Sequence, residues 1–143
     1  MVTIRREARL AVPAARVWEV ASPPASWADW LSLHASWPKE PPAGVGVGST
    51  FIEKVMLLNI PMPITWRITE FDAPSAFAMT GQSVMGVGLD IRFELVAADE
   101  ATDIAISAEL NGALVTGGLK NVVQQYADTH LTLSLEKLTS LLS

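Results

Sequence analysis

Hydrophobic and polar side chains alternate along residues 2–12, which is the period of a half-buried β-strand. Arg6 is the exception, because the alternation places its charge on the apolar face. Pro13 ends this strand and fits the first turn of a helix, so we expect a helix over residues 13–21. The apolar face of the strand consists of Val2, Ile4, Ala8, Leu10 and Val12.

Strand-like segments fill the middle of the chain. The clearest is GLDIRFELV, in which every second residue from Leu89 to Leu95, including Phe93, is apolar. Turn-forming residues such as Asp72-Ala73-Pro74-Ser75 separate the segments at hairpin spacing. The pattern predicts an antiparallel meander with strands at 49–58, 63–72, 75–83, 87–97 and 102–111.

The pattern becomes helical from about residue 113 to residue 142. A helix of about 30 residues is about 45 Å long, enough to cross a small sheet. Its apolar face changes direction along its length, so we expect the two halves to face different surroundings. One cluster is Leu119, Val122, Val123 and Tyr126, and the other is Leu131, Leu135, Leu138 and Leu142.

The stretch SWADWLSLHASWP, residues 26–38, is unusually rich in aromatic side chains. Ser26 is a candidate N-cap for a second short helix. Helical spacing would place Trp27, Trp30, Leu31 and His34 on one face, with Trp37 just beyond it. Such a face either packs into a core or lines a cavity for an apolar ligand, and the sequence leaves both readings open.

Composition and charge exclude several classes of function. The chain has 143 residues, which suits one domain over 1–143, and a net charge of −5, which argues against a nucleic-acid surface. It has no cysteine and only two histidines, His34 and His130, so we expect no metal site. The glycine run at 44–48 opens a strand rather than a helix, so we expect no nucleotide cofactor. No apolar run is long enough to span a bilayer, and no signal-peptide core is present, so we expect a cytoplasmic protein.

The segments VPAARVWEVASPPASWADWL and ITWRITEFDAPSAFAMTG, with the terminal helix, resemble the START and birch-pollen-allergen-like superfamily, also called SRPBCC. The resemblance covers essentially the whole chain. It implies an α+β helix-grip fold, in which a curved antiparallel sheet of about six or seven strands wraps a long C-terminal helix, with two short helices after the first strand. The polyketide cyclase/dehydrase group is one neighbour within the superfamily. The segments WLSLHASWPKEPP, NIPMPITWRITEFDAP and MTGQSVMGVGLDIRFEL are more similar to an actinobacterial subgroup described as toxins of type II toxin–antitoxin pairs.

The resemblance implies a cavity between sheet and helix that binds a hydrophobic or aromatic small molecule. The alternatives are a polyketide cyclase or dehydratase, and a toxin with an antitoxin protein as partner. A homodimer is also left open. The residues expected to line the cavity are Trp27, Trp30, His34, Trp66, Phe93, Leu119, Val123 and Tyr126.

Catalysis would need acid–base groups inside the cavity, and the candidates are Glu53, Glu70 and His34. The cyclase relatives carry an arginine on the strand where this chain has Glu70, and alternation sends Arg67 to the opposite face. The absence of that arginine weakens the hypothesis that the protein is a cyclase. Glu70 is placed on the face of Trp66, either as a base or as a group reaching solvent. Arg6 and Glu53 would pair or hold a ligand if both faced inward, and would otherwise mark an edge or a bulge.

Overall fold

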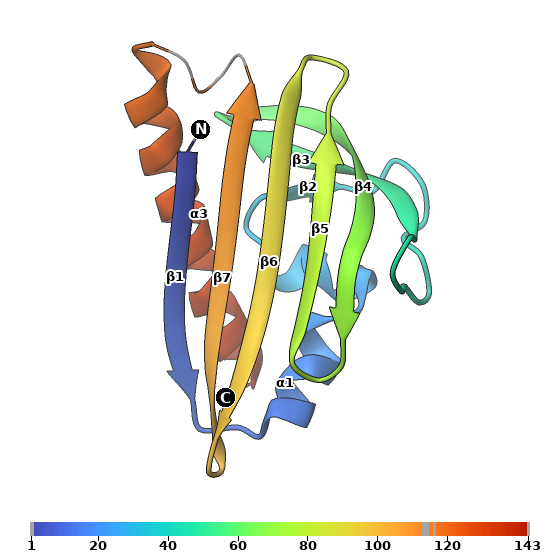
Figure 1. Cartoon of the computed structure of the whole chain (residues 1–143), viewed down its shortest axis with the longest axis vertical. Coiled ribbons are helices and arrows are strands. Elements are labelled where there is room, and N and C mark those ends of the chain that lie inside the picture. The colour runs from blue at the N-terminus through green and yellow to red at the C-terminus, as the bar shows by residue number, and fades with distance from the viewer. Residues whose placement is uncertain (1, 113–114, 116, 143) are drawn as a thin grey trace.

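The computed structural model describes residues 2–112, 115 and 117–142 and contains one seven-stranded antiparallel sheet (Figure 1). The strand order is β1-β7-β6-β5-β4-β3-β2, so β1 closes one edge next to β7 and the remaining strands follow as a meander. The antiparallel meander is as predicted, whereas the pairing of β1 with β7 and the strand β2 were not part of the prediction. The strands are β1 (Val2–Leu10), β2 (His34–Ser36), β3 (Thr50–Leu57), β4 (Ile60–Asp72), β5 (Ala76–Gln82), β6 (Val87–Ala98) and β7 (Ala101–Gly112).

One face of the curved sheet is covered by helices. The long helix α3 (Leu119–Leu142) runs behind β1 and β7 in Figure 1, and α1 (Ala14–Ala21) lies across the lower end of the same face. A 3-10 turn, η1 (Pro24–Ser26), and a single helical turn, α2 (Trp27–Trp30), follow α1. The predicted α+β helix-grip fold is therefore confirmed.

The second short helix is much shorter than the sequence pattern suggests. Leu31 has an extended backbone, and the chain then turns into β2, which pairs antiparallel with β3. The prediction that His34 shares a helical face with the tryptophans was therefore wrong. Ser26 also makes no capping hydrogen bond, because its hydroxyl donates to the carbonyl of Pro23 instead. Pairing with β3 satisfies the backbone that a longer helix would have satisfied internally.

The terminal helix begins at Leu119, later than the predicted start near residue 113. Gly117 adopts a positive φ of 61°, and Gly117-Gly118 immediately precede the helix. Two adjacent glycines favour the coil over the helix because their backbone loses most freedom on ordering. Residues 113, 114 and 116 of the predicted segment lie outside the described residues.

A register shift in β4 changes which face Glu70 occupies. From Met62 to Ile68 every second side chain is buried, but the pairing of β4 with β5 shifts between Ile68 and Glu70. The irregularity inserts one extra residue, so Glu70 points to the outer face and Phe71 packs inward on Trp18. The expectation that Glu70 continues the face of Trp66 was therefore wrong.

Aromatic rings fill the space between the sheet and the helices. Trp27 stacks on Phe77 with ring centroids 6.0 Å apart, and Phe77 stacks on Phe93 with ring centroids 5.3 Å apart. The ring centroids of Trp30 and Phe93 lie 5.6 Å apart, and Trp37 stacks on Trp27 with a centroid distance of 6.1 Å. The aromatic stretch at 26–38 therefore forms much of the hydrophobic core.

Gly81 on β5 lies so close to side chains of the neighbouring strand β4 that it leaves no room for a side chain of its own. A Cβ at this position would lie 2.4 Å from Ile64 Cγ2 and 2.7 Å from the nearest Trp66 ring atom. We expect Gly81→Ala to lower the free energy of unfolding by about 1–3 kcal/mol, because these buried groups must move. Urea denaturation measures the change. Gly46→Ala, where a Cβ meets no atom within 4 Å, is the control, and an equal loss in both variants would contradict the packing argument.

Candidate functional site

A buried carboxylate lies at the centre of the inward face of β3. The Glu53 side chain is 0% exposed, and its Oε1 accepts a hydrogen bond of 2.9 Å from Trp66 Nε1 on β4. Its Oε2 lies 2.5 Å from Nδ1 of His34 on β2. A carboxylate only accepts hydrogen bonds, so we assign the proton to His34 Nδ1. Three neighbouring strands therefore each contribute one group to this cluster.

This cluster brings together two residues that the sequence offered separately as acid–base candidates. Glu53 faces inward, but Arg6 does not reach it, because Arg6 pairs with Asp128 of α3 at the sheet edge. The compensation for the buried Glu53 thus comes from His34 and Trp66. The sequence did place Trp66 on the inward face, yet its hydrogen bond depends on the β3–β4 register, which alternation alone does not give.

Two indole N–H groups in the interior have no hydrogen-bond acceptor among the described residues. They belong to Trp30, whose residue surface is 2% exposed, and to Trp37. Trp27, by contrast, donates its indole N–H to the carbonyl of Ala21 at 3.0 Å. Buried donors without a partner are uncommon and cost free energy, so Trp30 and Trp37 are candidates for contact with a bound molecule.

The other residues expected to line a cavity divide into two groups. Trp27, Trp66, Phe93 and Val123 are buried, whereas Leu119 is 45% exposed at the start of α3. These four buried side chains do not line either of the two surface pockets described below. A ligand-binding role for these residues stays a prediction, and for the buried ones it requires the packed interior to open.

A surface groove of about 410 Å³ lies between the β3–β4 turn and α3. Tyr126 donates its hydroxyl to the carbonyl of Met56 at 2.9 Å and so ties the helix to β3. Its ring lies 4.2 Å from that of His130, whose Nδ1 lies 2.7 Å from Ser32 Oγ. The groove is lined by Leu58, Asn59, Val122, Gln125, Tyr126, Thr129 and His130.

Burial shifts the pKa values of both aromatic side chains in this groove. It raises the pKa of the Tyr126 hydroxyl above its ordinary value of 10.0. Burial, aided by the charge of Lys137, also lowers the pKa of His130 below its ordinary 6.5, against the opposing contact with the Ser32 backbone. Both side chains are therefore held in their neutral forms near pH 7.

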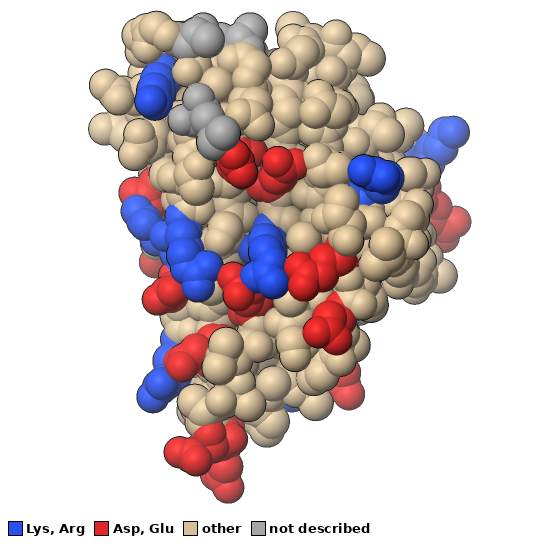
Figure 2. Space-filling model, in the orientation of Figure 1, with Lys and Arg blue, Asp and Glu red and all other residues tan. Residues whose placement is uncertain are grey.

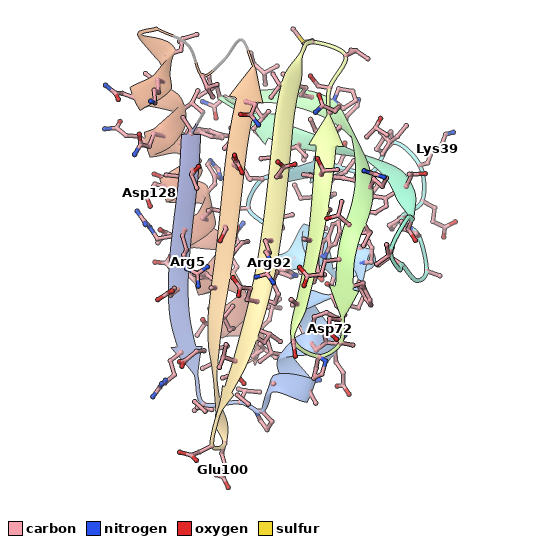
Figure 3. All side chains as sticks on the ribbon, in the orientation of Figure 1. Arg5, Lys39, Asp72, Arg92, Glu100 and Asp128 are labelled. Carbon is pink, nitrogen blue, oxygen red and sulfur yellow. The ribbon has the colours of Figure 1, made fainter. Side chains whose placement is uncertain are left out.

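The outer face of the sheet carries a band of paired charges, seen across the middle of Figure 2. Arg92, labelled in Figure 3, bonds both Glu70 and Glu94, and Glu94 also bonds Arg5. These hydrogen bonds, first that of Arg92 and then that of Arg5, lower the pKa of the Glu94 carboxyl. Glu70 thus lies in this outer network, away from Glu53 and His34.

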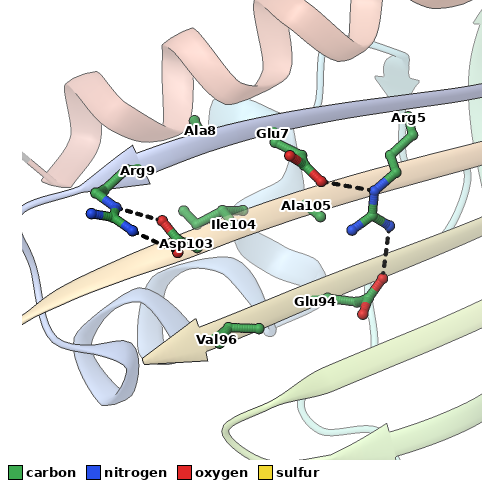
Figure 4. Close-up of a pocket in the computed structure, with 9 residues that line it drawn as sticks. All are labelled: Arg5, Glu7, Ala8, Arg9, Glu94, Val96, Asp103, Ile104 and Ala105. Atoms are coloured by element: carbon green, nitrogen blue, oxygen red, sulfur yellow. Dashed lines mark hydrogen bonds and ion pairs between the residues drawn. The ribbon is translucent and has the colours of Figure 1, made fainter. Parts of the chain in front are cut away.

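A pocket of about 470 Å³ lies on the same outer face, over β1, β7 and β6 (Figure 4). Its charged side chains already hold one another: Arg5 bonds Glu7, and Arg9 forms two hydrogen bonds with Asp103. The bond to Arg9 lowers the pKa of the Asp103 carboxyl. The pairing accounts for these charges without a ligand.

Within residues 2–112, 115 and 117–142, no three His, Asp or Glu side chains gather closely enough to hold a metal ion. None of the helices in that part of the chain is both long and apolar enough to cross a membrane.

Comparison with known proteins supports the fold. The model of a family described as "Polyketide cyclase / dehydrase and lipid transport" matches residues 1–142. The uncharacterized protein Rv1546 of Mycobacterium tuberculosis is 22% identical over 141 residues, 99% of each chain. A protein named Toxin Rv0910 from the same organism is 21% identical over 112 residues, 78% of each chain. A START superfamily structure from Mycobacterium smegmatis aligns with a TM-score of 0.72 at 14% identity, over 99% of each chain. An antitoxin partner and a homodimer stay predictions.

Removing the charge of Glu53 should cost far more stability than removing that of Glu70. We expect Glu53→Gln to lower the free energy of unfolding by about 1.5–3 kcal/mol, because it disturbs buried hydrogen bonds to a charged group. Glu70→Gln makes the same chemical change in a partly exposed ion pair and should cost at most about 1 kcal/mol. Chemical denaturation of both variants measures the difference. Equal losses would contradict the inward placement of Glu53.

His130 should make the protein less stable in mild acid. Its folded-state pKa lies below its unfolded value of 6.5, so the unfolded chain binds the proton more readily. The stability is fully present above about pH 6.5 and declines as the pH falls through the folded-state pKa. We expect His130→Asn to reduce the loss of unfolding free energy between about pH 7.5 and pH 5, measured by urea denaturation at each pH. An unchanged pH dependence would contradict the assignment.

Proposed function

Because the chain belongs to the polyketide cyclase/dehydrase and lipid transport family, we propose that it binds a hydrophobic or aromatic small molecule between its curved sheet and α3. The molecule carries a hydrogen-bond acceptor, which the indole N–H of Trp30 recognises. The observation that supports this proposal most directly is the buried Trp30 Nε1, which has no acceptor among the described residues. A ligand carbonyl or ether oxygen would remove the cost of that unpaired donor.

The surroundings of Trp30 suit an aromatic guest. Its ring packs on Phe93, and the rings of Phe77 and Trp27 continue the apolar wall. A planar group of tryptophan size buries about 150–250 Å², which is worth about 4–6 kcal/mol before the costs of binding. Burial would supply affinity, and the single N–H would supply orientation.

Entry requires the N-terminal half of α3 to move away from the sheet. This half buries only Val123 and Ala127, whereas the C-terminal half buries Leu131, Leu135 and Leu138. The smaller side chains leave less apolar contact to lose, and Tyr126 adds one hydrogen bond to Met56. The groove beside Tyr126 lies along this half of α3, between the helix and the β3–β4 turn.

A matched pair of ligands tests the proposal. 2-Acetylnaphthalene has a carbonyl oxygen where 2-isopropenylnaphthalene has a CH₂ group of similar shape. We expect calorimetric titration to show that the ketone binds about two- to tenfold tighter, the value of one net hydrogen bond. Trp30→Phe should keep the aromatic wall and abolish the preference, because it removes the N–H.

Trp18→Phe is the control, since Trp18 packs on Phe71 and Phe77 at the α1 end of the core. It should leave the preference for the ketone unchanged. The proposal is wrong if neither naphthalene binds the wild-type protein. A preference that persists in Trp30→Phe would show that another group recognises the acceptor.

A further inference from the structure

We propose that His34 is a general base that removes a proton from a carbon acid bound in the interior, with Glu53 as its positioning residue. This inference rests on the proposed ligand site and adds a reaction to it. The substrate class is a molecule with an acidic C–H next to a carbonyl or a comparable electron-withdrawing group. The proposal is based on the hydrogen-bonded pair of Glu53 and His34 and on the unpaired indole N–H of Trp37 beside it.

The hydrogen bonds determine which nitrogen of His34 is available. Glu53 Oε2 takes the proton-bearing Nδ1, so in neutral imidazole the lone pair lies on Nε2. The described residues provide no hydrogen-bond partner for Nε2. Trp66 holds the other carboxylate oxygen, which prevents Glu53 from rotating away from the imidazole. The arrangement therefore fixes the ring and its tautomer with the basic nitrogen free.

The pair lies at a position with little exposure to bulk water, which suits proton transfer. The side chains of His34 and Glu53 are 6% and 0% exposed. Their strands β2 and β3 are paired directly, and β4 with Trp66 continues the sheet. Because the His34 imidazole is held by a side chain of a paired strand, it keeps its orientation during the reaction.

Trp37 supplies a donor for the negative charge that develops. Its ring centroid lies 5.1 Å from that of His34, and its buried indole N–H has no acceptor among the described residues. In the step we propose, His34 Nε2 takes the proton on the carbon. The C–H electron pair forms a C=C bond, and the carbonyl π pair moves to the carbonyl oxygen. This oxygen accepts the Trp37 N–H and is a second acceptor of the substrate, distinct from the one that Trp30 recognises. The imidazolium then returns the proton to the substrate. Return to the same carbon reverses the step, and return to another atom gives an isomer of the substrate, so no further reactant is needed.

The probe 5-nitrobenzisoxazole reports such a base without knowledge of the natural substrate. The base removes the C3 proton, the C–H pair forms the nitrile, and the N–O bond breaks to give a coloured phenolate. We expect saturable turnover by the wild-type protein and a kcat at least about 100-fold lower in His34→Asn, in keeping with the contribution of a positioned base. His34→Gln serves as a second variant should His34→Asn fold poorly.

Glu53→Gln tests the positioning role separately. It should lower kcat by about tenfold or more and leave KM nearly unchanged, because Glu53 acts through His34 rather than on the probe. Glu70→Gln is the matched control, since it makes the same change on the outer face of the sheet, and it should retain the wild-type kcat. Near-ultraviolet circular dichroism confirms that each variant is folded.

Turnover of the probe and binding of 2-acetylnaphthalene test the base and the ligand site separately. A rate equal to that of the buffer overturns it, as does a rate that His34→Asn and His34→Gln leave unchanged. If 2-acetylnaphthalene still binds in either case, the ligand site stands and only the base assignment fails. A loss confined to the His34 and Glu53 variants supports the base assignment, and the ligand site is tested separately by the preference for the ketone.

Discussion

The arrangement of this interior depends on one costly element, the fully buried carboxylate of Glu53. A charge in such a position is tolerated only when its oxygens are paired, and Trp66 and His34 provide the two donors. Each donor comes from a different strand, so the pairing ties β2 to β3 and β3 to β4. The short β2 brings Trp37 with it, and Trp37 then packs on Trp27. The polar centre and the aromatic core are therefore parts of one structure.

The aromatic core answers the question of why the chain concentrates tryptophan at 26–38. These rings fill the concave side of a sheet that a single long helix crosses. Filling with rings leaves N–H groups inside, and the three described indoles of that stretch differ: Trp27 has a backbone acceptor, whereas Trp30 and Trp37 have none. Phenylalanine at such positions would leave no donor without a partner. These unpaired donors are the basis on which we propose ligand recognition.

The strands were predictable because alternation is local, and the segments 49–58 and 102–111 lie within one or two residues of β3 and β7. The sequence did not reveal β2, because three residues carry no period and their pairing is tertiary. The placement of Glu70 failed for a related reason, since one irregular residue in β4 reverses every later side chain. Glu53 and His34 were identifiable as unusual residues, but their contact depends on pairing between β2 and β3. Which indole lacks an acceptor is likewise visible only in three dimensions.

In the proposed complex the Trp30 N–H meets an acceptor on a ligand inside the fold. Two-dimensional ¹⁵N–¹H spectra of the indole groups, recorded with each naphthalene at saturation, test it most directly. We expect the Trp30 indole proton to move to lower field with 2-acetylnaphthalene and not with 2-isopropenylnaphthalene, because only the ketone accepts its hydrogen bond. A Trp30 signal that stays in place with the bound ketone, while surface signals move, would contradict it.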